Sequence, residues 1–246
     1  MEELLLRLQT ALIETTSKSR RTFWQSAFTA LISPEAEHPG FSYAIPTAPL
    51  SDADVNELIS IFRGAGKMPR LEFFPRLWPG LGDVLSTHGF KCEGEYPLMI
   101  LSKRDWAGAT SGISARLIGP DEAVLADRIA HVAFEMQGSA PDGATTAAGI
   151  VARRITCAIA QVNGHDVSTG FGIGDRAIRE IAGIATLPEF RRKGAATAVL
   201  NCLLTEFFDG GGDLVWLSAG DDGAKAAYAK VGFIDAGVQA NWSRTL

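Results

Sequence analysis

Residues 180–196 read EIAGIATLPEFRRKGAA, and this stretch decides the fold because it joins a strand, a turn and a helix. After Glu180 its first part is apolar or small, as in a strand of a sheet, and Pro188 ends that pattern. A basic turn containing Gly194 follows and opens directly onto a helix. The first N–H groups of a helix are unpaired and its N-terminus carries about half a positive charge, so this order predicts a phosphate-binding turn.

The charge of the turn supports this prediction. Each cation at a helix N-terminus is unfavourable by about 0.3–1 kcal/mol, so Arg191, Arg192 and Lys193 indicate that an anionic ligand supplies the missing charge. The alternative interpretation is a solvated basic first turn, which is the usual role of such a cluster. Two common nucleotide motifs, Gly-x-x-x-x-Gly-Lys-Ser/Thr and Gly-x-Gly-x-x-Gly after a strand, are absent from the sequence.

The turn resembles the acyl-CoA pyrophosphate loop of the GNAT superfamily of N-acyltransferases, whose pattern is Gln/Arg-x-x-Gly-x-Gly/Ala. Arg191 and Gly194 match its first two defined positions, and an alanine matches the third. A later helix carrying Tyr228 is followed by Gly-Phe at 232–233, which is similar to the family's closing Tyr-x-x-x-Gly-Phe signature. The resemblance covers about residues 113–246.

The resemblance implies an α/β (α+β) chain with the GNAT fold, in which a mixed, mostly antiparallel central sheet is flanked by helices. The second half of the sequence predicts elements in the family's order. A strand and two helices come first, and two antiparallel strands follow around Asn163-Gly164, the strongest hairpin signal in the chain. The phosphate-binding turn with its strand and helix, another strand, another helix and a final strand complete the order.

The first half of the sequence predicts further elements. Residues 3–33 carry apolar residues at helical spacing, which predicts helical structure up to Pro34. SDAD at 51–54 predicts a helix start, and Gly-Ala-Gly at 64–66 predicts its end. A strand at 70–74, a short helix at 78–86 and a strand at 96–102 complete this half.

A weak internal repeat relates the two halves, because helix, glycine-rich stop, strand, helix and Gly-Phe recur in the same order. Gly89 corresponds to Gly232, and the separation of these two glycines defines the offset of the repeat. At that offset Leu85 stands in the place of Tyr228, and no basic turn precedes the helix start at 51–54. The first half therefore resembles a family lobe that kept its scaffold and lost its chemistry.

We accordingly predict a degenerate tandem repeat. Residues 1–110 form a degenerate GNAT-like N-terminal lobe with leading helices, and residues 111–246 form the catalytic GNAT domain. A linker rich in glycine, alanine and serine, at residues 106–114, separates the two.

The resemblance assigns the general base to Glu180, because relatives that acetylate lysine side chains place a base at this spacing before the glycine that corresponds to Gly194. Along a strand Glu180 would share a face with Ile178, Ala182 and Ile184, and such apolar neighbours suit a general base. The alternative is a strand-end carboxylate paired with an arginine. The arginines considered for that pairing are Arg153, Arg154, Arg176 and Arg179.

The resemblance assigns the general acid to Tyr228, a phenol that would stand beside the sulfur of CoA. The alternative is a core tyrosine that packs under the final strand. Ser218, at the end of the preceding strand, is a looser candidate for the same role. Glu135 is a weaker second candidate for the base, because it ends a helix that in this family borders the acceptor pocket.

The cofactor contacts implied by the resemblance are mostly main chain. The N–H group near Ile184 would polarise the thioester carbonyl, and Ala185 and Thr186 would pair with the pantetheine arm like an added strand. Asp221 stands where relatives commonly carry an asparagine that touches the cofactor, and its negative charge departs from the pattern. The pyrophosphate would contact Arg191, Arg192, Lys193, Gly194, Ala195, Ala196 and Thr197.

Composition narrows the class of protein. The chain has 246 residues and a net charge of -5, which argues against nucleic acid as a partner. Cys92, Cys157 and Cys202 are dispersed, and the four histidines lack metal spacing, so we expect reduced thiols and no metal. The first residues have no basic segment and too short an apolar run for a signal or a membrane span, so we expect a cytoplasmic enzyme.

The sequence thus predicts an N-acyltransferase that moves an acetyl group from acetyl-CoA, its acyl-donor cosubstrate, to an amine by direct attack in a ternary complex. The acceptor would be a small-molecule or peptide amine, with no nucleic acid and no membrane involved. We expect a monomer or a homodimer. The alternative function is a catalytically lapsed acyl-CoA-binding module with a regulatory or partner-binding role.

Overall fold

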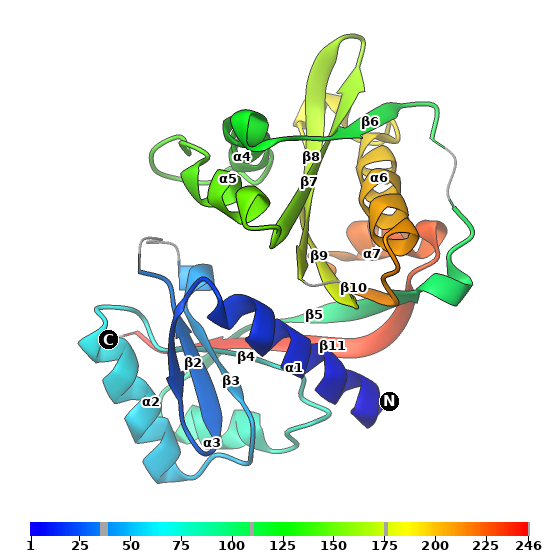
Figure 1. Ribbon diagram of the computed structural model, residues 1–246. Coiled ribbons are helices and arrows are strands. Elements are labelled where there is room, and N and C mark those ends of the chain that lie inside the picture. The colour runs from blue at the N-terminus through cyan, green and yellow to red at the C-terminus, as the bar shows by residue number, and fades with distance from the viewer. Residues whose placement is uncertain (35–38, 109–110, 175–176, 246) are drawn as a thin grey trace. The chain divides into compact units, whose positions relative to one another are not determined.

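The computed structural model describes residues 1–34, 39–108, 111–174 and 177–245, and these fold into two compact units (Figure 1). Unit 1 consists of Met1–Leu98, Ser218–Asp221 and Asp235–Leu246. Unit 2 consists of Met99–Leu217 and Asp222–Ile234. These units do not coincide with a division at the linker, because the last strand of the chain belongs to unit 1.

Unit 1 is a sheet with helices. Its strand order is β1-β2-β3-β4-β11-β5. β3 and β4 run parallel, and the pairs β1–β2, β2–β3 and β4–β11 run antiparallel. Its elements are α1 (Glu2–Ser17), β1 (Arg21–Trp24), β2 (Phe28–Ile32), β3 (Tyr43–Pro46), α2 (Asp52–Gly64), β4 (Arg70–Phe73), α3 (Leu81–Thr87), most of β5 (Lys91–Ser102) and nearly all of β11 (Ile234–Ser243).

The prediction of helical structure through residues 3–33 is wrong in its second half. Only α1 is helical, and β1 and β2 follow it as an antiparallel pair. Every residue of β2 is buried, so its apolar residues form a continuous run. Periodicity alone does not distinguish such a run from part of a buried helix.

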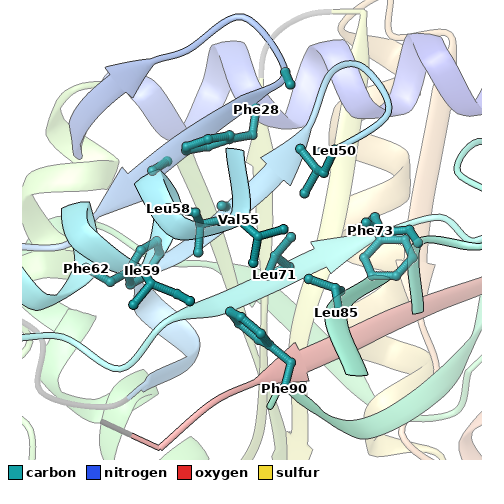
Figure 2. Close-up of a cluster of buried hydrophobic side chains, with 14 of the residues drawn as sticks. Phe28, Leu50, Val55, Leu58, Ile59, Phe62, Leu71, Phe73, Leu85 and Phe90 are labelled. Carbon is teal, nitrogen blue, oxygen red and sulfur yellow. The ribbon is translucent and has the colours of Figure 1, made fainter. Parts of the chain in front are cut away.

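The core of unit 1 is built on α2. Val55, Leu58 and Phe62 lie at helical spacing and are fully buried, together with Phe28 of β2 and Leu71 of β4 (Figure 2). This spacing gives one apolar stripe that packs on the sheet. The helix begins where the sequence predicted a start, at 51–54.

Unit 2 is a mixed, mostly antiparallel sheet flanked by helices, which confirms the predicted fold class. Its strand order is β10-β9-β8-β7-β6, and only β9 and β10 run parallel. Figure 1 shows α4 and α5 on one face of this sheet and α6 on the other. Its elements are β6 (Ser114–Leu117), α4 (Ala123–Ala133), α5 (Ala144–Val151), β7 (Ile155–Val162), β8 (His165–Gly174), β9 (Ile178–Thr186), α6 (Ala195–Asp209), all but the last residue of β10 (Leu214–Ser218) and α7 (Asp222–Val231).

The predicted hairpin at Asn163-Gly164 joins β7 and β8 as expected. Both residues have positive φ, 52° and 81°, which is the conformation that a two-residue hairpin turn requires and that Asn-Gly adopts readily. Gly-Asp-Arg at 174–176 also predicts a turn, but Asp175 and Arg176 lie outside the described residues.

The order of elements repeats between the units. In each unit a helix connects two parallel neighbouring strands: α2 connects β3 to β4, and α6 connects β9 to β10. The two helices begin at Asp52 and Ala195. Their starts are as far apart in the sequence as the glycines of the two Gly-Phe pairs, so the structure keeps the offset of the repeat.

Candidate active site

The site is built where β9 and β10 separate. The two strands pair at only three positions, the last of which joins Glu180 to Trp216. β9 continues to Thr186, and over this length its other edge pairs with β8. The edge of β9 beyond Glu180 is therefore not covered by β10, and it offers backbone groups to an extended ligand.

A β-bulge lies in this uncovered part of β9. Thr169 of β8 faces Ala185 and Phe171 faces Ala182, so Gly183 and Ile184 together stand opposite a single residue. Gly183 has φ of 60°, a conformation that glycine adopts without steric cost. A bulge of this kind redirects the backbone and side chains next to it.

The bulge corrects one expectation about Glu180. A Cβ placed on Gly170 would lie 2.3 Å from Cδ1 of Ile184 and 2.8 Å from Cγ1 of Val199 in α6. Ile184 therefore points to the α6 face of the sheet. The prediction that Ile184 shares a face with Glu180 is wrong, because the extra residue shifts the alternation of side chains by one.

Glu180 lies on the opposite face. It stands across from Ile173 of β8 and Trp216 of β10, and it is half-buried. Its neighbour Arg179 points to α6 and forms an ion pair with Glu206, so Arg179 is engaged away from the Glu180 face. Of the other arginines weighed for a structural pairing, Arg176 is outside the described residues.

The predicted phosphate-binding turn follows β9 after a short 3₁₀ helix, Pro188–Phe190. Gly194 is the N-cap of α6, has φ of 90°, and provides no side-chain cap. The first N–H group that bonds back into this helix is that of Ala198, to the carbonyl of Gly194 at 3.0 Å. The N–H groups of residues 195–197 therefore have no partner within the helix.

The turn also contains a strained residue. Arg192 has φ of 61°, which is uncommon outside glycine and costs on the order of 1 kcal/mol or more. Left-handed residues in a turn direct neighbouring N–H groups toward one concave side, which is how backbone nests hold anions. A Cβ on Gly194 would have 3.8 Å of room to Cδ1 of Ile113, so the glycine is required by its backbone conformation and not by space.

The cations of the turn have different surroundings. The Arg191 guanidinium donates from Nε to the carbonyl of Thr186 at 3.2 Å and from Nη2 to the carbonyl of Ala133 at 2.8 Å. The Lys193 ammonium lies 5.1 Å from the centre of the Phe190 ring. No sequence signal indicated that Arg191 binds protein carbonyls, because the partner in Ala133 is 58 positions away along the chain.

The end of β9 is fixed by neighbouring side chains. The Ser168 hydroxyl donates to the carbonyl of Ala185 at 2.7 Å and lies 2.9 Å from the Thr186 hydroxyl. With Arg191 on the Thr186 carbonyl, both of these carbonyls already accept a hydrogen bond. Ala185 and Thr186 are thus held in place at the point where β9 leads into the turn.

Tyr228 lies on α7 and is half-buried. Its ring centre is 6.0 Å from that of Phe233, with the two planes at 55°, and its carbonyl accepts a hydrogen bond from the Phe233 N–H at 3.1 Å. Ser218 ends β10 and is half-buried, and Asp221 precedes α7 and is exposed. Glu135 is exposed, with φ of 52°, just beyond α4.

Other features of the molecule lie apart from these groups. Burial raises the pKa of Cys157 to about 12, so this thiol stays protonated.

A surface cavity of about 460 Å³ lies beside α6 and is lined by Leu117, Ala198 and Cys202 among others, but not by Glu180 or Tyr228.

The described part of the chain has neither a membrane-crossing helix nor a metal-binding cluster. Within it, no helix combines the length and the apolar character needed to cross a membrane. The same residues contain no group of three or more His, Cys, Asp or Glu side chains placed to hold a metal ion.

Comparisons with known proteins agree with this architecture. The sequence model described as "Acetyltransferase (GNAT) family" matches residues 130–233, which include Glu180, the turn and Tyr228. No curated protein matches the chain.

Solved structures share the fold over most of the chain. A GCN5-related N-acetyltransferase from Kribbella flavida is 23% identical, with a TM-score of 0.79 over 99% of this chain and 96% of that one. A GCN5-related N-acetyltransferase from Sphaerobacter thermophilus is 15% identical, with a TM-score of 0.63 over 89% and 76%. A tandem GNAT protein from the clavulanic acid biosynthesis pathway is 14% identical, with a TM-score of 0.58 over 88% and 78%.

Proposed function

We propose that the chain, whose residues 130–233 match the GNAT family, is an N-acyltransferase of that superfamily that moves an acetyl group from acetyl-CoA to an amine. The acceptor attacks directly while both substrates are bound. The observation that carries the proposal is the turn before α6, where unpaired N–H groups and left-handed residues meet beside the uncovered edge of β9. This arrangement suits a phosphate joined to an extended arm.

The turn would hold the pyrophosphate of the cosubstrate through the N–H groups of residues 192–197. The arm would lie along β9 beyond Glu180 and pair with Ala185 and Thr186. Acetyl-CoA supplies the acetyl group as a thioester. An N–H group at the bulge near Ile184 would donate to the thioester oxygen, which is supported by the redirected backbone there.

Two side chains would move the protons. Glu180 would take a proton from the amine, directly or through a water, as the nitrogen bonds to the carbonyl carbon. Tyr228 would donate a proton to the departing thiolate as the C–S bond breaks. Ser218 remains a looser candidate for that donor, Glu135 a second candidate for the base, and Asp221 a predicted contact of the cofactor.

We also propose that unit 1 is a degenerate copy of the same fold. The repeated strand-helix-strand order supports this, as does the common offset of the helix starts and of the Gly-Phe pairs. Leu85, at the position of Tyr228, is fully buried in the core of unit 1 (Figure 2). Unit 1 would then contribute stability and no catalysis.

The experiment is thiol release from acetyl-CoA by the full chain, measured with a panel of small-molecule and peptide amines and with no amine as the control. We expect release that depends on the amine. CoA binding measured by calorimetry, without release for any amine, would instead favour an acyl-CoA-binding module whose chemistry has lapsed.

A further inference from the structure

Arg191 connects the end of α4 to the start of the turn before α6. Its side chain bonds to the carbonyl of Ala133, the last residue of α4, and to the carbonyl of Thr186 at the end of β9. Its own N–H group donates to the carbonyl of Pro188 at 3.3 Å, so its amide and two of its guanidinium nitrogens bind protein carbonyls. The residue begins the turn that leads into α6.

The two helix ends have opposite polarity. The carbonyls of residues 130–132 in α4 accept from the N–H groups of residues 134–136, whereas that of Ala133 accepts from the guanidinium. A cation is favourable at this negative end of the helix. The backbone that follows Arg191 leads to the positive N-terminus of α6. A planar guanidinium binds two carbonyls at once, which a lysine ammonium on a flexible stem does poorly.

The segment beyond Ala133 depends on this end of α4. Glu135 has a left-handed conformation, and its N–H donates to the carbonyl of Val132 at 3.1 Å. The N–H of Met136 donates to the carbonyl of His131 at 3.0 Å. Phe134 and Met136 are 53% and 39% exposed, so few packing contacts hold this segment in place.

We propose that Arg191 is a positioning residue that couples occupancy of the phosphate-binding turn to the order of residues 133–136. This inference rests on the proposed function, since CoA is taken as the ligand of the turn. Phosphate bound by the N–H groups after Arg191 fixes the backbone of the turn, and the guanidinium transmits that restraint to the carbonyl of Ala133. The candidate base Glu135 and its exposed neighbours are then ordered before an acceptor arrives.

The test is amide hydrogen exchange of the full chain, with and without saturating CoA, read at Glu135 and Met136. Calorimetry first establishes that each variant binds CoA, and thermal melting that each is folded. In the natural sequence we expect CoA to slow exchange at these amides at least about fivefold, the lower end of typical coupling between sites. Arg191→Gln should bind CoA and lose this slowing.

Two further variants separate the geometry from the charge. Arg192→Gln removes the same charge one residue away and should keep the slowing at saturating CoA. Arg191→Lys keeps the charge but should lose most of the slowing, because one ammonium does not bridge both carbonyls. A purely structural role would instead raise exchange equally with and without CoA.

The outcomes are distinct. Failure of the natural sequence to bind CoA would overturn the proposed function together with this inference. CoA binding without any slowing, or equal slowing in Arg191→Gln, would overturn only the role of Arg191.

Discussion

The starts of α2 and α6 occupy the same place in the repeat and have opposite chemistry. At the offset of the repeat, the cap Ser51 corresponds to Gly194. The Ser51 hydroxyl accepts from the Asp54 N–H at 3.3 Å, and the Asp54 carboxylate accepts from the Ser51 N–H at 2.8 Å. Helix α6 has no such cap and no acidic residue in its first turn.

The two helices differ in how their first N–H groups are satisfied. Both helices connect parallel strands, so the strand-helix-strand unit itself does not determine whether an anion is bound. In α2 the Ser51 and Asp54 side chains accept from two of the first N–H groups, and acidic residues supply the negative charge. In α6 a glycine and the cations before it supply no such cap and no negative charge, and we propose that an anionic ligand takes that role.

The largest expected effect is on kcat, and it comes from replacing the candidate base and the candidate acid, which both lie in unit 2. General acids and bases typically contribute about 10²–10⁴-fold each, so Glu180→Gln and Tyr228→Phe should lower kcat within that range and leave CoA affinity nearly unchanged. The Gln variant should recover much of its rate at high pH, where the amine is already neutral. The Phe variant should stay slow at all pH values, because the thiolate still lacks its donor.

A pH series of kcat for both variants, on one good acceptor, distinguishes these roles. Equal losses that do not change with pH, or no loss, would mean that the two residues serve packing and that unit 2 performs its chemistry with other groups.

A smaller effect is expected from the cap of α6. Gly194→Val should weaken CoA binding by about 2 kcal/mol or more, because a β-branched residue at φ of 90° would shift the N–H groups proposed to bind the phosphate. The measurement is calorimetry on the folded variant. The matched control is Gly66→Val in unit 1, which has φ of 65° and open space around it, and which should cost stability but no affinity.

Unchanged CoA affinity in folded Gly194→Val would contradict the assignment of the turn before α6 as the phosphate-binding site. An equal loss of affinity in Gly66→Val would mean that both variants act by general destabilisation.

The smallest expected effect is on the stability of the fold, and it comes from replacing Asp54 in the cap of α2. Hydrogen bonds from the Ser51 side chain and then its backbone lower the pKa of Asp54 in the folded protein. A lowered pKa stabilises the fold above the unfolded pKa, and this stabilisation is lost as pH falls through the folded value. Asp54→Asn should therefore lower the stability of the fold near neutral pH and change it almost not at all in strong acid.

Urea unfolding at several pH values measures this difference. CoA affinity near neutral pH should be the same in Asp54→Asn and the natural sequence, since α2 carries its own anion. A loss of stability that does not depend on pH would mean that the carboxylate charge is not what caps α2.

The sequence predicted the features that depend only on residues close together in the chain. The SDAD start of α2, the hairpin at Asn163-Gly164 and the glycine before α6 each fix a local conformation that few other residues adopt. The fold class, which the resemblance to the GNAT superfamily implied, is confirmed by the structure and the comparisons.

Features that depend on distant partners were not predictable. Strand β2 is buried throughout, so its sequence matched a helix as well as a strand. The bulge at Gly183 shifts Ile184 to the other face, and only the register with β8 reveals it. The contact of Arg191 with Ala133 joins residues 58 positions apart, and no local spacing encodes it.

The placement of β11 has a consequence for how the protein folds as it is made. β11 completes the sheet of unit 1 against β4, yet all the strands and helices of unit 2 from β6 to α7 are synthesised between these two strands. During synthesis on the ribosome, the edge of β4 that pairs with β11 therefore stays unpaired until unit 2 has been translated. Such long-range pairing slows folding and exposes the edge to other chains, so we infer that unit 1 reaches its native state last although it is translated first.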